Sequence, residues 1–501
     1  MNRQLVRLAL VAVVLLVALV VATTYWQAWA AGGLAARQDN AVELVSQFQV
    51  ARGLILASNG TTVFAANRKV RRNGQSFYFR RYPAHGLAAQ TIGYSTSALS
   101  QTGLEESLND YLTGATTNLS NAIQRTLDRL GGGTVFGDSV VLTLNAGAQA
   151  LAQQLLGDRC GAVVAMNPRT GAVYVMASSP TYDPNLVDKP GGYAKILKIQ
   201  GTCKGSSALL NRATYGLFTP GSTFKMVTAA AALDTGAFTP ASTFNDPGYC
   251  TEYGKQVKNA LNPDQNGPEA YGHPTLALGF EHSINSVFCN VGKQIGAKTI
   301  LDYTKKFGFY STPPLETPAN QRVPSGLYHD VKGRPVLWFP KDPATEVDPG
   351  RLAFGQERMQ VTPLQMLLVA STIANGGIVP RPYIVDRVIG HDKSVVSRTR
   401  PSNLGRAIKP KTAAELTQMM ISVVQGGTGT HAQIPGIQVA GKTGTAETAV
   451  NNVYTAWFVC FAPADDPKVA VAVVLEDQLN GFGGSVSAPI AKQILEKLLH
   501  G

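Results

Sequence analysis

The longest apolar run in the chain lies close to its N-terminus. Leu8–Ala22 carries no charge, and an uncharged segment with tyrosine and tryptophan follows, so the run reaches the length of a membrane-spanning helix, about 20 residues. Arg3 and Arg7 precede it, which predicts a cytoplasmic N-terminus and an exported remainder. A cleaved signal peptide is the alternative, because Ala28-Trp29-Ala30 fits a cleavage site. The length and the aromatic flank favour an uncleaved membrane anchor over residues 1–30.

Between residues 31 and 135 the pattern predicts a small module. Gln38–Val50 has the pattern of a helix, and apolar runs on both sides of Asn59-Gly60 predict a β-hairpin over residues 51–63. Another helix is expected over Thr102–Leu112. This stretch holds no nucleophile and base at catalytic spacing. We therefore expect residues 31–135 to form a non-catalytic N-terminal module, of a pedestal or dimerisation kind.

From Asp138 onward the pattern predicts an α+β domain over residues 138–501. Short connections between the predicted strands indicate an antiparallel sheet flanked by helices. The region 237–275, rich in glycine, proline and asparagine, predicts an irregular surface insertion, and 308–350 is loop-rich. We expect strands at 140–144, 161–167, 171–178, 437–445, 455–462 and 468–475, and helices at 146–156, 276–292, 300–307, 362–374, 416–424 and 488–499.

Composition adds constraints on domains and partners. A chain of 501 residues predicts two or three domains, and its formal net charge is +12. Apart from Arg68–Arg72 and Arg80-Arg81 the basic residues are dispersed, which fits a surface facing anionic lipid or polymer and predicts no nucleic-acid partner. The five cysteines lack the spacing of a zinc site, so no metal or cofactor is expected. Their odd number leaves at least one thiol free or intermolecular, and the pairing stays open.

The candidate nucleophile lies in the stretch Thr219-Pro220-Gly221-Ser222-Thr223-Phe224-Lys225, which leads into an alanine-rich helix. Pro220-Gly221 interrupts the preceding segment, so Ser222 is expected at or near the helix N-terminus. Lys225 follows three residues later on the same face. A desolvated lysine amine can accept the proton of the serine hydroxyl. This motif alone is common by chance, and the simpler alternative is a serine N-cap beside a solvated lysine.

Two further motifs strengthen the interpretation of Ser222 as a catalytic nucleophile. Ser283-Ile284-Asn285 is a Ser-x-Asn, and Lys442-Thr443-Gly444-Thr445 falls on the predicted strand 437–445. Ser-x-x-Lys, Ser-x-Asn and Lys-Thr-Gly in this order are the signature of penicillin-binding proteins and serine β-lactamases. His282, beside the second motif, is interpreted as a packing or surface residue.

With these motifs the chain resembles a class B penicillin-binding protein over nearly its whole length. The short first module most resembles the penicillin-binding protein A type of actinobacteria. The resemblance implies a penicillin-binding or serine β-lactamase-like transpeptidase domain after residue 138. It rests on the anchor and on Arg52-Gly53, Asn59-Gly60, Arg81-Tyr82-Pro83, Gly103-Leu104-Glu105, Asn211-Arg212-Ala213, the Ser222 stretch, Phe354-Gly355-Gln356, Thr362-Pro363-Leu364-Gln365 and Lys442-Thr443-Gly444-Thr445.

This resemblance implies the chemistry of a serine-type D,D-transpeptidase, an acyltransferase of peptidoglycan synthesis. Ser222 is expected to attack the D-Ala-D-Ala bond of a donor stem peptide and to release D-Ala. Lys225 is expected to be a buried general base between Ser222 and Asn285. An amine of a neighbouring stem peptide then resolves the acyl-enzyme. β-Lactams are expected to acylate the same serine covalently.

The remaining site residues have supporting roles by the same resemblance. Ser283 is expected to pass a proton to the leaving amine while Lys442 polarises its hydroxyl. Asn285 is expected to hold Lys225 and the donor peptide. The oxyanion hole is expected from the backbone N–H groups of Ser222 and Thr445. The residues expected to bind the substrate, including its carboxylate, are Thr443, Gly444 and Thr445.

The resemblance also implies a single-pass plasma-membrane protein with its catalytic domain outside the cytoplasm, a partner glycan polymerase, and division or elongation proteins. Four alternatives remain: a β-lactamase, for which Glu316 and Asn320 have a suggestive spacing, a D,D-carboxypeptidase, a membrane-tethered β-lactam sensor and a catalytically idle scaffold. The anchor and first module are superfluous in a hydrolase. Only about seven residues precede the apolar run, too few for a signalling region. A scaffold is expected to have lost a motif, and none is lost.

Overall fold

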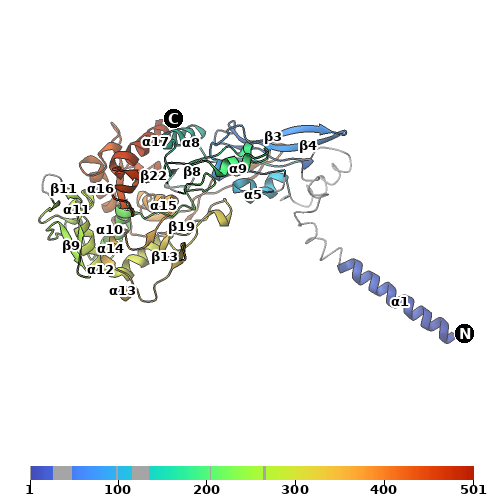
Figure 1. Ribbon diagram of the computed structural model, residues 1–501, viewed down its shortest axis with the longest axis horizontal. Helices are drawn as coiled ribbons and strands as arrows, with labels where there is room; N and C mark the ends of the chain where they lie inside the picture. The colour runs from blue at the N-terminus through green and yellow to red at the C-terminus, as the bar shows by residue number, and fades with distance from the viewer. Residues whose placement is uncertain are drawn as a thin grey trace.

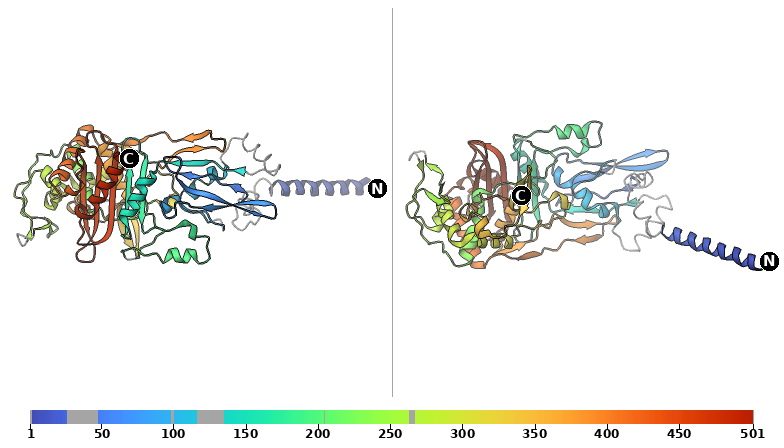
Figure 2. Two further views of the ribbon diagram at one scale, coloured as in Figure 1. Left: turned by 90° about the horizontal axis from the view of Figure 1, so that it is seen from above. Right: turned by 60° about the horizontal axis from the view of Figure 1, so that its bottom comes forward.

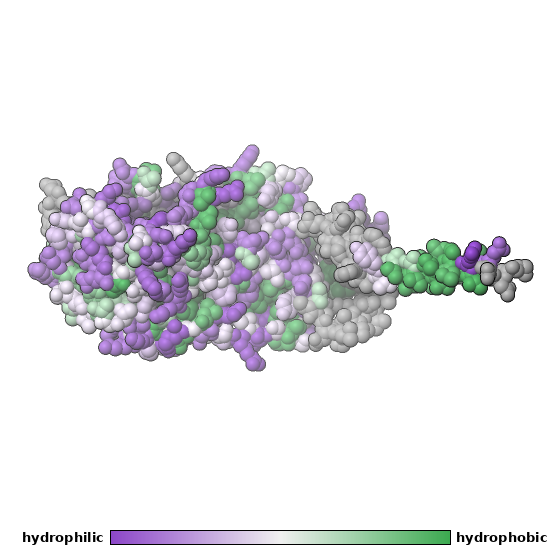
Figure 3. All heavy atoms as spheres, turned by 90° about the horizontal axis from the view of Figure 1, so that it is seen from below, coloured by the Kyte–Doolittle hydropathy of each residue, from purple (hydrophilic) through white to green (hydrophobic). Residues whose placement is uncertain are grey.

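The N-terminal helix stands apart from the rest of the molecule. The computed structural model describes residues 2–25, 48–97, 100–115, 135–203, 205–262 and 267–500 (Figure 1). Helix α1 (Asn2–Thr24) contains a segment, Val6–Thr24, that is long and apolar enough to cross a membrane, and none of that segment is buried. Figure 3 shows it as a continuous hydrophobic rod projecting from a mixed polar surface. The helix expected over Gln38–Val50 lies almost wholly outside the described residues.

A five-stranded antiparallel sheet forms the centre of the larger part of the molecule (Figure 2). Its order is β20-β21-β22-β7-β8, so the two early strands complete the sheet made by the last three, as the sequence predicted. The strands are β7 (Gly161–Met166), β8 (Val173–Ser179), β20 (Ala440–Glu447), β21 (Val453–Ala462) and β22 (Val469–Leu479).

Helices cover both faces of this sheet, because successive strand residues point to opposite sides. On one side Val163, Val471 and Phe458 pack with helices α8 (Ala146–Leu156) and α17 (Ala488–His500). On the other side Val164, Ala472 and Trp457 join the larger core. The helices of that core include α10 (Lys225–Asp234), α15 (Pro363–Ala374) and α16 (Pro410–Gln425). The α+β architecture predicted from the sequence is confirmed.

A second, six-stranded sheet lies at the end of the body nearer to α1 (Figure 1). Its order is β18-β17-β6-β2-β3-β4. The hairpin predicted around Asn59-Gly60 is present, since β2 pairs with β3 antiparallel. Strand β6 pairs parallel with β2 and antiparallel with β17, so this sheet joins segments that are distant in sequence. The strands are β2 (Ile55–Leu56), β3 (Val63–Arg72), β4 (Gln75–Arg81), β6 (Ser139–Leu142), β17 (Val385–Ile389) and β18 (Val395–Arg398).

A buried ion cluster fastens a short helix to this sheet. The Glu105 carboxylate contacts the Arg52 guanidinium at 3.0 Å and that of Arg80, on β4, at 2.6 Å. All three side chains are at least nine-tenths buried. Glu105 lies on α5 (Gly103–Ser107), which is followed by α6 (Asn109–Thr113). The single helix predicted over Thr102–Leu112 is therefore two short helices.

Three other predictions need correction. The helix expected over residues 276–292 is broken into α11 (Leu276–Glu281) and α12 (Asn285–Lys306), and α12 is kinked at Gly296. The region 237–275 contains an antiparallel hairpin, β9 (Tyr249–Glu252) and β10 (Lys255–Lys258). The loop-rich stretch 308–350 contains another. The remaining elements are α4 (Ala89–Ile92), α9 (Gly192–Leu197), α13 (Pro343–Glu346), α14 (Pro349–Ala353), β1 (Val50–Ala51), β5 (Val135–Phe136), β11 (Leu261–Asn262), β12 (Gly267–Pro268), β13 (Gly326–Val331), β14 (Arg334–Trp338), β15 (Met359–Gln360), β16 (Ile378–Pro380) and β19 (Asn403–Arg406).

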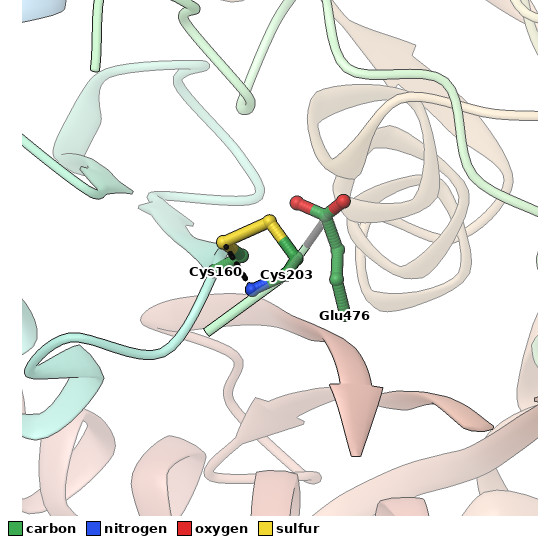
Figure 4. A group of neighbouring side chains, drawn as sticks. All are labelled: Cys160, Cys203 and Glu476. Atoms are coloured by element: carbon green, nitrogen blue, oxygen red, sulfur yellow. Dashed lines mark hydrogen bonds between the residues drawn. A yellow bond between two sulfur atoms is a disulfide. The ribbon is translucent and has the colours of Figure 1, made fainter. Parts of the chain in front are cut away.

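Four of the five cysteines form two disulfides, a pairing that the sequence left open. One joins Cys160 to Cys203, and the other joins Cys250 to Cys289. Cys460, on β21, is a buried free thiol. Figure 4 shows the Glu476 carboxylate beside the first disulfide. The sulfur atoms of each disulfide are bonded to each other, so neither pair of cysteines offers a thiolate to a metal ion.

Candidate active site

Ser222 lies in a tight turn that runs directly into a buried helix. The turn is a single 3-10 segment, η3 (Gly221–Phe224), and α10 begins at the next residue. Gly221 has a φ of +51°, and a Cβ built on it would lie 2.9 Å from the carbonyl oxygen of Thr445. Only glycine adopts this conformation at so close an approach without strain. The turn thus places half-buried Ser222 against strand β20, at a helix N-terminus as predicted.

The side chain of Lys225 is completely buried beside this turn. Its Nζ donates to the carbonyl oxygen of Ser283 at 2.7 Å and to Oδ1 of Asn285 at 2.8 Å, and lies 3.2 Å from Oγ of Ser283. Burial, and in second place the charge of Lys442, hold the pKa of Lys225 well below its usual value of 10.5. The neutral amine is therefore accessible at much lower pH than in a solvated lysine.

Ser283 stands in the break between α11 and α12. Its φ of 60° places a non-glycine residue in the left-handed region, which costs of order 1–3 kcal/mol. This conformation turns the chain so that the carbonyl oxygen and the hydroxyl of Ser283 both lie near Lys225. Asn285 then begins α12. The broken helix is thus the feature that brings the Ser-x-Asn motif to the nucleophile.

Lys442 reaches the same hydroxyl from the sheet. It lies on β20, is completely buried, and its Nζ donates to Ser283 Oγ at 3.0 Å and to the carbonyl oxygen of Thr443 at 3.2 Å. Burial lowers the pKa of Lys442 to about 7. The ammonium lies 5.5 Å from the ring centre of Phe280, a distance at which a cation–π contact contributes. Ser283 Oγ is therefore contacted by two buried amines.

The rest of the Lys-Thr-Gly-Thr motif lies along the same strand. A Cβ built on Gly444 would lie 2.8 Å from the carbonyl oxygen of Pro220, so glycine lets the strand approach the turn of the serine. The Thr443 hydroxyl hydrogen-bonds to that of Thr428 at 2.6 Å, and the Thr445 hydroxyl accepts a hydrogen bond from the N–H of Gly483 at 3.3 Å. The three motifs that the sequence singled out thus meet around one site.

Some expected contacts differ. Among the described residues no hydrogen bond joins Ser222 to Lys225, whereas the expected contact of the lysine amine with Asn285 is present, and Ser283 adds another. The Glu316 carboxylate accepts from the N–H of Ile384 at 2.8 Å, beside β17, and burial raises its pKa. Its hydrogen bonds are not with the three motifs. His282 packs against Tyr271, as its interpretation as a packing residue predicted.

Two groups at the site were missed from the sequence. The Thr428 hydroxyl extends the row of polar groups on β20, and the carbonyl oxygen of Lys258 accepts from Nδ2 of Asn285 at 3.0 Å. Thr428 lies in a glycine-rich turn after α16, where threonine is an unremarkable residue. A backbone carbonyl leaves no mark in a sequence. Neither was detectable without the tertiary arrangement.

Comparisons with known proteins agree with this arrangement. The penicillin binding protein transpeptidase domain matches residues 161–496, and the penicillin binding protein A dimerisation domain matches residues 52–140. Peptidoglycan D,D-transpeptidase PbpA of Mycobacterium tuberculosis strain H37Rv is 34% identical, with all of both chains covered. PbpA of Mycolicibacterium smegmatis is 33% identical over all of this chain and 99% of that protein.

Two solved structures are similar over most of the chain. The ceftriaxone acyl-enzyme complex of penicillin-binding protein A from M. tuberculosis has a TM-score of 0.75 and 32% identity, covering 90% of this chain and 99% of that chain. A D,D-transpeptidase domain from Eggerthella lenta has a TM-score of 0.73 with the same identity and coverage. Fold and site thus define a serine acyltransferase of the penicillin-binding class. The chain belongs to the penicillin-binding protein transpeptidase family, of the class B type with a penicillin-binding protein A dimerisation module.

Proposed function

We propose that this protein is a peptidoglycan D,D-transpeptidase whose nucleophile is Ser222. The observation that carries the proposal is the convergence of Lys225 and Lys442, both fully buried, on the hydroxyl of Ser283 beside the serine turn. Structural lysines are almost never fully buried without a carboxylate partner. Two buried amines at one hydroxyl are an arrangement suited to proton transfer.

Acylation uses the free amine of Lys225. A neutral amine has two N–H groups and one lone pair, and the Ser283 carbonyl and Asn285 Oδ1 accept two N–H bonds. The lone pair is then free to take the hydroxyl proton of Ser222 as its oxygen attacks the D-Ala-D-Ala carbonyl. The backbone N–H groups of Ser222 and Thr445 stabilise the oxyanion. Hydrogen bonds between a base and its nucleophile often form fully only in the complex with substrate.

Release of D-Ala requires that the proton reach the leaving amine. Ser283 bridges Lys225 and Lys442, so its hydroxyl relays the proton from the first amine while the second stabilises the negative charge that develops. Protonated Lys442 attracts the substrate carboxylate, to which Thr443 and Thr445 offer hydroxyls beside Gly444. The amine of a neighbouring stem peptide then attacks the acyl-enzyme, and the same groups act in reverse to form the cross-link.

The same proposal covers the organisation of the chain. Residues 1–30 anchor the protein in the plasma membrane with the N-terminus in the cytoplasm, residues 31–135 form the non-catalytic module, and 138–501 form the transpeptidase domain outside the cytoplasm. Helix α1 and the match to a dimerisation domain support this division. A partner glycan polymerase and division or elongation proteins are expected, because the enzyme joins strands that another activity polymerises.

Fluorescent penicillin labelling tests the nucleophile. Full-length protein in detergent is expected to form a stable covalent adduct, and Ser222→Ala is expected to form none, with Thr223→Ala as a matched variant of a neighbouring hydroxyl. Undiminished labelling of Ser222→Ala contradicts the proposal. The acceptor is then tested with a donor stem peptide and an amine. Transfer supports a transpeptidase, whereas water as the sole acceptor supports a D,D-carboxypeptidase, and rapid loss of the penicillin adduct supports a β-lactamase.

A further inference from the structure

One buried carboxylate close to the site has no part in the chemistry above. Asp246 is 1% exposed and belongs to the region 237–275, which the sequence pattern assigned to the surface. It accepts hydrogen bonds from Ser286 Oγ at 2.6 Å, from Asn259 Nδ2 at 3.0 Å to each oxygen, and from the N–H groups of Gly248 at 2.8 Å and Tyr271 at 3.0 Å. All of these donors are neutral. A carboxylate buried among so many donors is an anchor of defined geometry.

Asn259 also hydrogen-bonds to the first turn of α12. Its Oδ1 accepts from the backbone N–H of Ser286 at 2.9 Å, while its Nδ2 donates to Asp246 and to the carbonyl oxygen of Glu269. Ser286 is thus held through its hydroxyl by Asp246 and through its backbone by Asn259. Because Ser286 directly follows Asn285, this pair fixes the position of the second motif.

The same segment also fixes the orientation of the Asn285 amide. Its Nδ2 donates to the carbonyl oxygen of Lys258, the residue directly before Asn259, and its Oδ1 accepts from Lys225. The two ends of an amide differ in hydrogen-bonding character. A carbonyl on one side therefore selects the orientation in which the oxygen faces Lys225. The alternative orientation would place an NH₂ group against the amine.

A covalent bond ties the same hairpin to the same helix. Cys250 on β9 is bonded to Cys289 on α12, one helical turn after Asn285. Cys250 pairs with Val257 in the β9–β10 register, next to the pair of Tyr249 with Lys258. Figure 1 shows β9 at the end of the body remote from α1, beside α12. The hairpin therefore contacts α12 through a disulfide, and the residues that flank it, Asp246 and Asn259, contact α12 through hydrogen bonds.

From these contacts we propose that Asp246 is a positioning residue for the acylation of Ser222. It acts through Asn259 and Ser286 on Asn285, which holds the amine of Lys225. The proposal rests on the function proposed above. It adds that the segment 237–275 helps to hold the catalytic residues in position. A displacement of about 1 Å in such a group can slow a reaction about a hundredfold.

The test compares acylation rates of full-length variants with fluorescent penicillin. Asp246→Asn keeps the size of the side chain but turns one acceptor into a donor that faces donors. We expect its second-order acylation constant to fall about ten- to a hundredfold, with the same final labelling stoichiometry as wild type. Asp234→Asn is the matched control, because Asp234 is also a buried carboxylate with neutral donors, among them Tyr303 and Thr412, at the other end of α10. It is expected to lower the melting temperature without slowing acylation.

A double-mutant cycle separates positioning from general destabilisation. If Asp246 acts through Asn285, Asp246→Asn slows acylation little further in an Asn285→Ala background. Additive losses, or an unchanged rate for Asp246→Asn, overturn the proposal. If Asp246→Asn does not fold, Ser286→Ala removes the same hydrogen bond from the side of the helix. A wild-type acylation rate for Ser286→Ala then overturns the proposal equally. Wild-type protein that fails to label contradicts the proposed function instead, so the two failures are distinguishable.

Discussion

Lys225 and Lys442 meet at one oxygen atom: their Nζ atoms lie 3.2 and 3.0 Å from Oγ of Ser283. The two lysines come from opposite sides of the site, one from the helix that follows the nucleophile and one from the edge strand of the sheet. Two ammonium groups that contact the same oxygen atom repel each other, and both of these lysine side chains are buried away from water. The arrangement therefore favours one neutral and one charged amine, which are the states that a base and a carboxylate-binding group need.

The first prediction concerns the pH dependence of acylation. Lys225 acts as a base only when neutral, and its lowered pKa makes the neutral form available well below pH 10.5. Lys442 attracts a carboxylate only when charged, and it loses its proton as pH rises through about 7. The second-order rate constant for a penicillin should therefore rise and then fall with increasing pH, with the falling limb near neutrality.

The variant Lys442→Arg checks which group controls the falling limb. Arginine stays charged at all accessible pH values, so the falling limb should disappear even if the maximal rate drops. Stopped-flow acylation measured from pH 5 to pH 10 distinguishes the cases. A falling limb that persists in Lys442→Arg contradicts the assignment of that limb to Lys442.

The second prediction concerns the left-handed conformation of Ser283. Glycine adopts a φ of 60° without the penalty that a Cβ carries, whereas alanine keeps that penalty and, like glycine, lacks the hydroxyl. Ser283→Gly should therefore be more stable to unfolding than Ser283→Ala by about 1 kcal/mol. Both should acylate far more slowly than wild type, because both lose the relay oxygen. Chemical denaturation measures the first effect and penicillin labelling the second, and equal stability of the two variants would argue against strain at this residue.

The elements that the sequence predicted well are those with local signals. Helix α15 begins after Thr362, whose hydroxyl accepts from the N–H of Gln365, with Pro363 in the first turn. A capping side chain and a proline at the first position are readable from the sequence itself. Helix α8 has the predicted bounds because Asn145 caps it and glycine follows its last residue. The β7–β8 hairpin follows from two apolar runs around a turn.

The features that sequence reasoning missed depend on contacts between distant segments. Ser283 carries no sign of a left-handed conformation, and the break it causes is supported by Lys442, which lies 159 residues away. Asp246 and Asn259 belong to a polar stretch and were assigned to the surface, yet both are buried. Their partner Ser286 lies on a helix formed later in the chain. Polar residues predict exposure only where the folded chain offers them no buried hydrogen-bond partner.

The third prediction concerns the buried cluster of the N-terminal module. Removing the carboxylate in Glu105→Ala leaves the guanidinium groups of Arg52 and Arg80 buried and facing each other. Breaking a buried ion cluster in this way costs about 3–5 kcal/mol of unfolding free energy. The neighbouring Glu106 is exposed, so Glu106→Ala is a matched control with an expected change below about 0.5 kcal/mol. Thermal unfolding of both variants measures the difference, and similar melting temperatures would show that the cluster does not stabilise the module.

The last prediction uses the two disulfides as a matched pair. They close loops of similar length, with sequence separations of 43 and 39 residues, so replacing either pair by serine should cost about 2–4 kcal/mol of stability. Their effects on acylation should differ. Cys250→Ser/Cys289→Ser releases the β9–β10 hairpin from the helix that begins with Asn285. Cys160→Ser/Cys203→Ser changes the start of strand β7, which strands β21 and β22 separate from the motif strand β20. Only the first double variant should acylate several-fold more slowly, because the hairpin carbonyl that orients the Asn285 amide is then held only by hydrogen bonds. Thiol titration of denatured, unreduced wild type should count one free thiol, that of Cys460. Equal acylation rates in the two double variants would mean that the hydrogen bonds of Asp246 and Asn259 hold the hairpin on their own.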